Sequence, residues 1–146
     1  MLPSVWPGAV VYLDPAALIS RGGRATGDPS HWVNRLGYFL IVEVTKQHVR
    51  LRPLYSRWRK GRELLPTRDK SGPPAFVDRP SYWSWDQEWI SDPVAGRDAA
   101  SEWASRNGTG ASVRLTPQLL DFMGPIHAQA MIGGANTSAL FVAGHG

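Results

Sequence analysis

The sequence predicts a mainly β protein, a small curled barrel followed by a C-terminal helix. The strongest sign is the stretch 38–56, in which an apolar run and an alternating run flank a short polar break. A second sign is the presence of 15 glycines and 12 prolines, which favour short strands and frequent turns over long helices. A third is the alternation of tryptophans over 81–90, which has the period of a half-exposed strand.

The length of 146 residues and the 42% share of hydrophobic residues suit one domain with a sizeable core. We therefore expect a single domain over residues 1–146. The barrel and the C-terminal helix are expected within 1–132, and 133–146 is expected to be a small, apolar tail that docks or frays.

The elements before the hairpin begin with turn residues at 6–8 and a strand over 9–13, which Asp14-Pro15 ends. Residues 16–19 suit a helical turn, and a glycine-rich loop with two arginines follows over 21–29. This loop has the glycine spacing of a P-loop but lacks its Lys-Ser/Thr, so we exclude a nucleoside triphosphate site. The loop is expected to be a mobile flap that closes over a ligand.

The hairpin over 38–56 begins with a run, Tyr38–Val42, of the β-branched and aromatic types that suit a buried strand. Its second strand alternates, because side chains on a strand point to opposite faces in turn. One parity holds Val49, Leu51 and Tyr55, and the other holds Arg50, Arg52 and Ser56. We expect the first strand to be buried and the second to present its arginines to solvent or to a ligand.

Three tryptophans, Trp83, Trp85 and Trp89, share one parity of the segment 81–90. They are either a stacking platform for bases or partners, or they close the core of the barrel, and the second interpretation is favoured because aromatic residues dominate cores. The opposite parity carries Asp86 and Glu88, which suit a cation or a shared proton. A solvated strand face explains these carboxylates more simply.

The last elements are a short helix over 98–103, a turn at 107–110 and a helix opening at Thr116-Pro117, where threonine caps and proline takes the first helical position. Leu119, Leu120, Met123 and Ile126 are expected to line one face of this final helix. Pro125 should shorten or kink it, and Gly133-Gly134 should end it.

Several classes of site are excluded by composition. The chain has no cysteine, which removes disulfides, zinc–thiolate sites and thiol nucleophiles. Its four histidines show no metal-ligand spacing, so we expect neither a metal nor another cofactor. The beginning of the sequence lacks the pattern of a signal peptide, and no apolar run approaches the ~20 residues that cross a bilayer. We expect a soluble, cytoplasmic protein without membrane contact.

The positive charge is concentrated in one segment. Net charge is +4, yet the window 46–70 holds nine cations against two carboxylates. Such a stripe is the electrostatic footprint of a polyanion, although a merely solvated loop is an even alternative. An indole within the stripe favours nucleic acid, because it stacks on bases. The predicted nucleic-acid-binding residues are Arg50, Arg52, Arg57, Trp58, Arg59, Lys60 and Arg62.

Two residues bracket the hairpin and are candidates for chemistry. Arg35 precedes the buried strand, and Ser56 closes the strand that follows. If the sheet curls, both meet at one mouth. An arginine can hold a phosphate by two parallel hydrogen bonds and stabilise its developing charge, and a hydroxyl can position a non-bridging oxygen. A salt-bridged arginine and a turn-forming serine remain the structural alternatives.

The order of these features resembles the MazF/PemK family of toxin ribonucleases. The resemblance rests on Pro7-Gly8 before a strand, Arg35 before an apolar strand, and Pro53-Leu54-Tyr55-Ser56 at the end of the next strand. It is close over 7–56 and looser over 110–132. The chain differs from the family at Ala9, where an acidic residue is usual, and at Leu36-Gly37, where a proline normally follows the arginine.

The resemblance implies an SH3-like barrel that cleaves single-stranded RNA without a metal, with Arg35 and Ser56 as the catalytic residues. It further implies a homodimer and an antitoxin protein that covers the basic groove. Two other functions stay open: a non-catalytic nucleic-acid-binding module on the same barrel, and a structural or assembly protein of a mobile element or phage.

Overall fold

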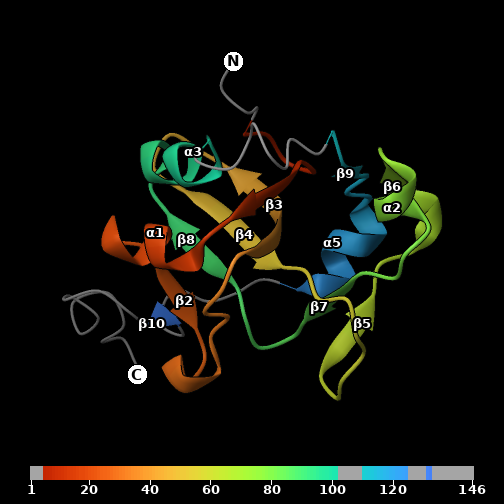
Figure 1. Ribbon diagram of the computed structural model, residues 1–146, viewed down its shortest axis with the longest axis horizontal. Helices are drawn as coiled ribbons and strands as arrows, with labels where there is room; N and C mark the ends of the chain where they lie inside the picture. The colour runs from red at the N-terminus through yellow and green to blue at the C-terminus, as the bar shows by residue number, and fades with distance from the viewer. Residues whose placement is uncertain (1–4, 102–109, 125–130, 133–146) are drawn as a thin grey trace.

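A computed structural model describes residues 5–101, 110–124 and 131–132 (Figure 1). Its centre is a six-stranded sheet with the strand order β1-β3-β4-β8-β2-β10, in which every neighbouring pair is antiparallel. The strands of this sheet are β1 (Val10–Leu13), β2 (Arg24–Thr26), β3 (Gly37–Val44), β4 (Val49–Pro53), β8 (Trp89–Ser91) and β10 (Met131–Ile132). The prediction of a mainly β protein is confirmed.

Two small ladders accompany the main sheet. β5 (Arg62–Leu64) pairs with β7 (Tyr82–Ser84), and β6 (Lys70–Ser71) pairs with β9 (Ser112–Val113). In the described residues β1 and β10 are the two edges of the main sheet and are not paired with each other, so these strands form an open sheet and no closed barrel.

The helices in the described part of the chain are short. They are α1 (Pro15–Ser20), α2 (Pro74–Val77), α3 (Pro93–Ser101) and α5 (Pro117–Met123), with 3₁₀ turns η1 (Pro29–His31) and η2 (Thr67–Asp69). Thr116 caps α5 as predicted, because its Oγ1 accepts a hydrogen bond from the backbone N–H of Leu119 at 3.1 Å. Gly124, with φ of 73°, is the C-cap of α5, so the helix ends before Pro125.

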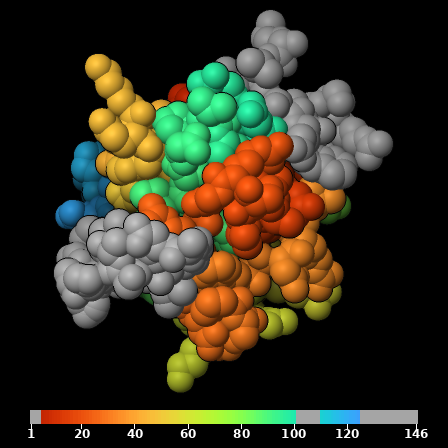
Figure 2. All heavy atoms as spheres, turned by 90° about the vertical axis from the view of Figure 1, so that its left-hand side faces the viewer, coloured from red at the N-terminus to blue at the C-terminus, as the bar shows by residue number. Residues whose placement is uncertain are grey.

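The core lies on both faces of the main sheet, because alternate residues of β1 and β3 point to opposite sides. Val11, Phe39 and Ile41 belong to one buried cluster, together with side chains from α1 and α3. Val10 and Leu40 belong to a second cluster on the other face, with side chains from β9 and α5. Figure 1 shows the helices on either side of the sheet, and Figure 2 shows α1 and α3 side by side over one face. Burial on both faces explains the unbroken apolar run of β3.

The predicted hairpin is confirmed as β3 and β4, joined by a turn in which Thr45 Oγ1 accepts hydrogen bonds from the N–H groups of Gln47 and His48. A β-bulge between Ile41 and Glu43 shifts the register, so that Glu43 lies opposite Arg50. The first strand is buried at its centre as expected, since Phe39, Leu40 and Ile41 are all at most 1% exposed, whereas Tyr38 at its start is 42% exposed.

Two predictions about segments are wrong. The glycine-rich loop is not a flap, because Arg24–Thr26 forms the interior strand β2 between β8 and β10 and its Ala25 is fully buried. Residues 81–90 are not one strand either. They form β7, a turn and the start of β8, and a turn ends the alternation on which the prediction rested.

The turn also separates the tryptophans. Trp83 and Trp89 are fully buried, in the second and first core clusters respectively, so the preferred interpretation as core residues is confirmed for both. Trp85 is 41% exposed. The final helix was expected to continue to Gly133-Gly134, which is wrong, because α5 ends at Met123 and Met131–Ile132 is the strand β10. Residues 107–109 of the predicted turn, the end of the short helix beyond 101, Ile126 and the tail over 133–146 lie outside the described residues.

Candidate nucleic-acid interface

Arg35 and Ser56 line the same groove. The groove has a volume of about 780 Å³ and runs along the end of the β3–β4 hairpin, with residues 31–36 on one side and 53–57 and 59 on the other. Both side chains are exposed. The prediction that the two residues meet at one mouth agrees with this arrangement, whereas the glycine-rich loop that was expected beside them does not line the groove.

The register of the hairpin explains why they converge. Phe39 of β3 pairs with Pro53 of β4, and the N–H of Leu54 donates to the carbonyl of Tyr38 at 2.8 Å. In an antiparallel pair, the residues before the first strand lie beside those after the second. Arg35 precedes β3 and Ser56 follows β4, so a local pairing places a guanidinium and a hydroxyl at the same edge.

Further cations surround this edge. Arg57 and Arg59 are exposed and line the groove. Arg62 also lines it, with its guanidinium carbon 3.5 Å from the centre of the Tyr55 ring and its Nη1 donating to the carbonyl of Arg57 at 3.0 Å. A guanidinium stacked on a ring is held in place while its remaining N–H groups stay available. The groove thus presents four arginines to a ligand.

Tyr55 stays protonated at neutral pH. Its burial raises the pKa of the phenol to about 12, against a smaller opposing effect of the Arg62 charge. Burial also lowers the pKa of Arg62, although a guanidinium is effectively always protonated in proteins. The pair therefore presents a cation and a neutral hydroxyl.

Trp58 and Lys60 belong to the same basic loop without lining the groove. The Trp58 side chain is 64% exposed, and Lys60 is exposed as well. Trp58 is the most exposed of the large hydrophobic side chains that the structure describes as exposed.

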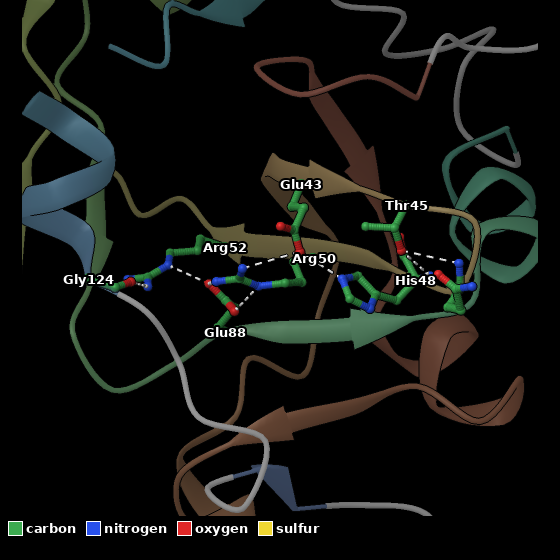
Figure 3. Close-up of polar contacts among 8 residues, drawn as sticks. Glu43, Thr45, His48, Arg50, Arg52, Glu88 and Gly124 are labelled. Carbon is green, nitrogen blue, oxygen red and sulfur yellow. Dashed lines mark hydrogen bonds and ion pairs between the residues drawn. The ribbon is translucent and has the colours of Figure 1, made fainter. Parts of the chain in front are cut away.

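Arg50 and Arg52 are not part of this surface, and the prediction that they face solvent is wrong for Arg52. Arg52 is 1% exposed and Arg50 is half-buried. Figure 3 shows both guanidinium groups directed at Glu88, the residue directly before β8. The Nε of Arg50 donates to Oε1 of Glu88 at 2.7 Å, and the Nε of Arg52 donates to its Oε2 at 3.0 Å.

The remaining N–H donors of Arg52 connect the main sheet to β7 and to the end of α5. Its Nη1 donates to the carbonyl of Ser84 at 3.4 Å, and its Nη2 donates to the carbonyls of Met123 and Gly124, each at 3.3 Å. Its guanidinium carbon also lies 5.3 Å from the centre of the Trp83 ring. Arg52 therefore fastens the end of α5 to the sheet, which is a structural role.

Burial and pairing shift the pKa values of the groups in this network in different directions. Burial lowers the pKa of Arg52, whereas for Arg50 the hydrogen bonds and charge of Glu88 outweigh burial and raise the pKa. At the exposed end His48 lies 2.7 Å from Glu43, and this hydrogen bond lowers the pKa of the Glu43 carboxyl. The sequence reading placed Glu88 on a solvated face, which is wrong because its side chain is 2% exposed.

No metal-binding cluster of three or more histidine or acidic side chains occurs in 5–101, 110–124 and 131–132. Within those same ranges, none of the helices has the length and apolar character to cross a bilayer.

Comparison with known proteins identifies no relative of this chain. No protein family, curated protein or solved structure gives a significant match to this chain. The resemblance to the toxin ribonucleases therefore rests on the residues quoted above.

Proposed function

We propose that this protein is a metal-independent endoribonuclease that acts on single-stranded RNA in the groove between Arg35 and Ser56. The observation that carries the proposal is the shared groove itself, in which a serine hydroxyl and four arginines, Arg35, Arg57, Arg59 and Arg62, line one cavity. Arginine holds phosphate by parallel hydrogen bonds and remains charged at any physiological pH, so it can bind the RNA backbone without a metal.

The chemistry is attack by a ribose 2′-oxygen on the adjacent phosphorus. The new bond joins the 2′-oxygen to phosphorus as the 2′-hydroxyl gives up its proton. The bond to the 5′-oxygen of the next nucleotide breaks as that oxygen takes up a proton, which leaves a 2′,3′-cyclic phosphate and a 5′-hydroxyl. Arg35 stabilises the charge that develops on the phosphate oxygens and assists proton transfer, and Ser56 orients a non-bridging oxygen. Arg57 and Arg59 hold the flanking backbone.

His31 is a further candidate for the proton transfer. It lines the same groove, in the 3₁₀ turn η1 that precedes Arg35. An imidazole can accept the proton of the 2′-hydroxyl or return one to the leaving oxygen.

A second candidate function is binding of single-stranded nucleic acid without cleavage. The observation that favours it is the 64% exposure of Trp58 within the basic loop, because exposed aromatic side chains among arginines are typical of stacking platforms. This function uses the same groove, with Arg35 as a phosphate contact only. The implied homodimer and antitoxin partner are compatible with either function.

The test is incubation of the purified protein with a long single-stranded RNA in excess EDTA. We expect discrete cleavage that Arg35→Ala reduces at least about 100-fold, as for loss of a donor to developing charge. Ser56→Ala should reduce it by about 10- to 100-fold, as for loss of a hydrogen bond to a charged group. Arg97→Ala on α3 and Ser71→Ala in β6 are matched controls, since both side chains are exposed and lie outside the groove lining.

The outcomes separate the candidates. RNA that is intact but shifted on a gel, with a shift weakened by Arg35→Ala and by added salt, supports the binding module. RNA that is intact and unshifted excludes both functions and leaves the assembly protein.

A further inference from the structure

A second hollow adjoins the groove and differs from it in character. Its volume is about 470 Å³, and it shares Leu36, Gly37, Tyr38, Leu54, Tyr55 and Ser56 with the groove. The two spaces therefore meet along the wall that carries Ser56. From there the hollow extends toward Tyr12 of β1 and toward the segment 73–81, which includes α2.

The hollow is lined mainly by apolar and aromatic side chains. Tyr12 and Tyr38 contact each other edge to face, with ring centres 4.9 Å apart, and Phe76 of α2 contributes a third ring beside prolines 73 and 80. Among the described residues that line it, Arg79 is the one cation, whereas the groove has four arginines.

The side of the hollow that α2 forms is contacted by Lys70 of β6. Lys70 is buried, its Nζ donates a hydrogen bond to the carbonyl of Arg79, and the same Nζ lies 4.5 Å from the centre of the Phe76 ring. These two contacts tie the Phe76 ring and the backbone at Arg79 to the buried Lys70 of β6, so this side of the hollow is held by contacts within the protein. An aromatic cavity with few polar groups is typical of a small-molecule or base site.

The two spaces match the two parts of a nucleotide. A phosphate belongs in the groove, where arginines replace its hydration, because burying a charge among apolar side chains is costly. A base has apolar faces that stack on aromatic rings and polar edges that a serine, a tyrosine hydroxyl or an arginine can contact.

We propose that the hollow holds the base of a nucleotide whose phosphate lies in the groove at Ser56. The inference rests on the proposed function, because it takes single-stranded RNA as the ligand of the groove. It adds a specificity site: the base next to the scissile phosphate is selected by Tyr12, Tyr38 and Phe76, with Arg79 and Ser56 at its edges. The occupant is a nucleobase, and the continuity of the hollow with a cationic groove is what distinguishes it from a site for an apolar peptide.

The test fills the hollow without removing a core side chain. Ala75 is exposed, lines the hollow and follows the proline that begins α2. Ala75→Trp should therefore occlude the base site. Ala16→Trp is the matched control, because Ala16 is exposed and follows the proline that begins α1, and it does not line either space.

The probes are short 2′-O-methyl oligoribonucleotides, which cannot be cleaved, and the same backbone with one to three central abasic positions. We expect wild type and Ala16→Trp to bind the oligomer with bases about 5- to 100-fold more tightly than the abasic one, the range for one stacked base. Ala75→Trp should lose most of this difference while keeping its affinity for the abasic backbone.

The other possible results overturn either the base site or the ribonuclease function. Wild-type protein that binds both oligomers equally, or that binds neither, overturns the inference, and so does an Ala75→Trp variant that keeps the full difference. Cleavage of unmodified RNA is measured in parallel. Cleavage by wild type with no base-dependent binding retains the ribonuclease and removes the base site, whereas base-dependent binding lost in Ala75→Trp with no cleavage retains the base site and removes the ribonuclease.

Discussion

Replacement of Glu88 by glutamine tests the buried ion network that fastens the main sheet to α5. Glu88 accepts hydrogen bonds from Arg50 at 2.7 and 3.1 Å and from Arg52 at 3.0 Å, and its side chain is 2% exposed. Glu88→Gln keeps the shape of the side chain but removes its negative charge. Two guanidinium groups then share an uncharged acceptor, and that of Arg52 is 1% exposed, so water does not replace the lost partner.

The expected cost follows from this burial. Removing one partner of a buried pair costs about 3–5 kcal/mol, because the other charge is left without compensation. A protein of this size is stable by about 5–15 kcal/mol, so the change takes a large share of the total. Its midpoint of thermal unfolding should fall by roughly 10 °C, at about 2–4 °C per kcal/mol.

The assay is equilibrium unfolding in urea, followed by the fluorescence of the buried tryptophans. Asp121→Asn is the matched control, because Asp121 lies on α5, lines a separate pocket together with Glu88 and Arg52, and is exposed. It should change the free energy of unfolding by less than about 0.5 kcal/mol. A loss below about 1 kcal/mol for Glu88→Gln would refute the reasoning, since it would mean that the network is solvated or unpaired in solution.

Three further predictions concern other parts of the fold. Because the pKa of Tyr55 is raised to about 12, the folded state keeps a proton that the unfolded state loses above pH 10. Between pH 10 and 12 the free energy of unfolding of wild type should therefore fall by up to about 2–3 kcal/mol more than that of Tyr55→Phe. Equal losses for the two proteins in urea titrations would contradict this. Gly8→Ala should destabilise the protein by more than Gly22→Ala. Both glycines have positive φ, which costs an alanine about 1–3 kcal/mol, but only at Gly8 would the added Cβ meet the carbonyl oxygen of Val113, at 2.6 Å. Equal unfolding midpoints for the two variants would count against that contact. Trp58→Ala should weaken RNA binding by about 5- to 100-fold and leave the slope of affinity against salt unchanged, because it removes stacking and no phosphate contact; a changed slope would argue against stacking.

Part of the candidate site was predictable because it depends on a local pairing. Arg35 and Ser56 flank one hairpin, and an antiparallel hairpin brings its two outer ends together whatever the rest of the chain does. The exposure of Arg57, Trp58, Arg59 and Lys60 was predictable for a similar reason, since a charged loop between strands stays in solvent.

The roles of Arg50 and Arg52 were not predictable from their alternation. Periodicity tells which face of a strand a side chain takes, but it cannot tell whether another layer covers that face. Here α5 and the turn before β8 cover it, and the partner of Arg52 is Glu88, 36 residues away. The same limit applies to β2, which looked like a loop because its own residues carry little strand signal. Its place in the sheet depends on β8 and β10 on either side.

The sequence by itself determined the mainly β class, the β3–β4 hairpin, the cap of α5 at Thr116 and the basic loop after β4. All of these depend on interactions within a few residues, whose energies are already decided by local chemistry. The tertiary structure alone decided that the sheet is open and covered on both faces, that Glu88 accepts hydrogen bonds from two arginines, and that an aromatic hollow adjoins the cationic groove. These features arise where segments far apart in the chain pack together, and such contacts form only because the whole fold gains by burying apolar surface, which no local pattern specifies.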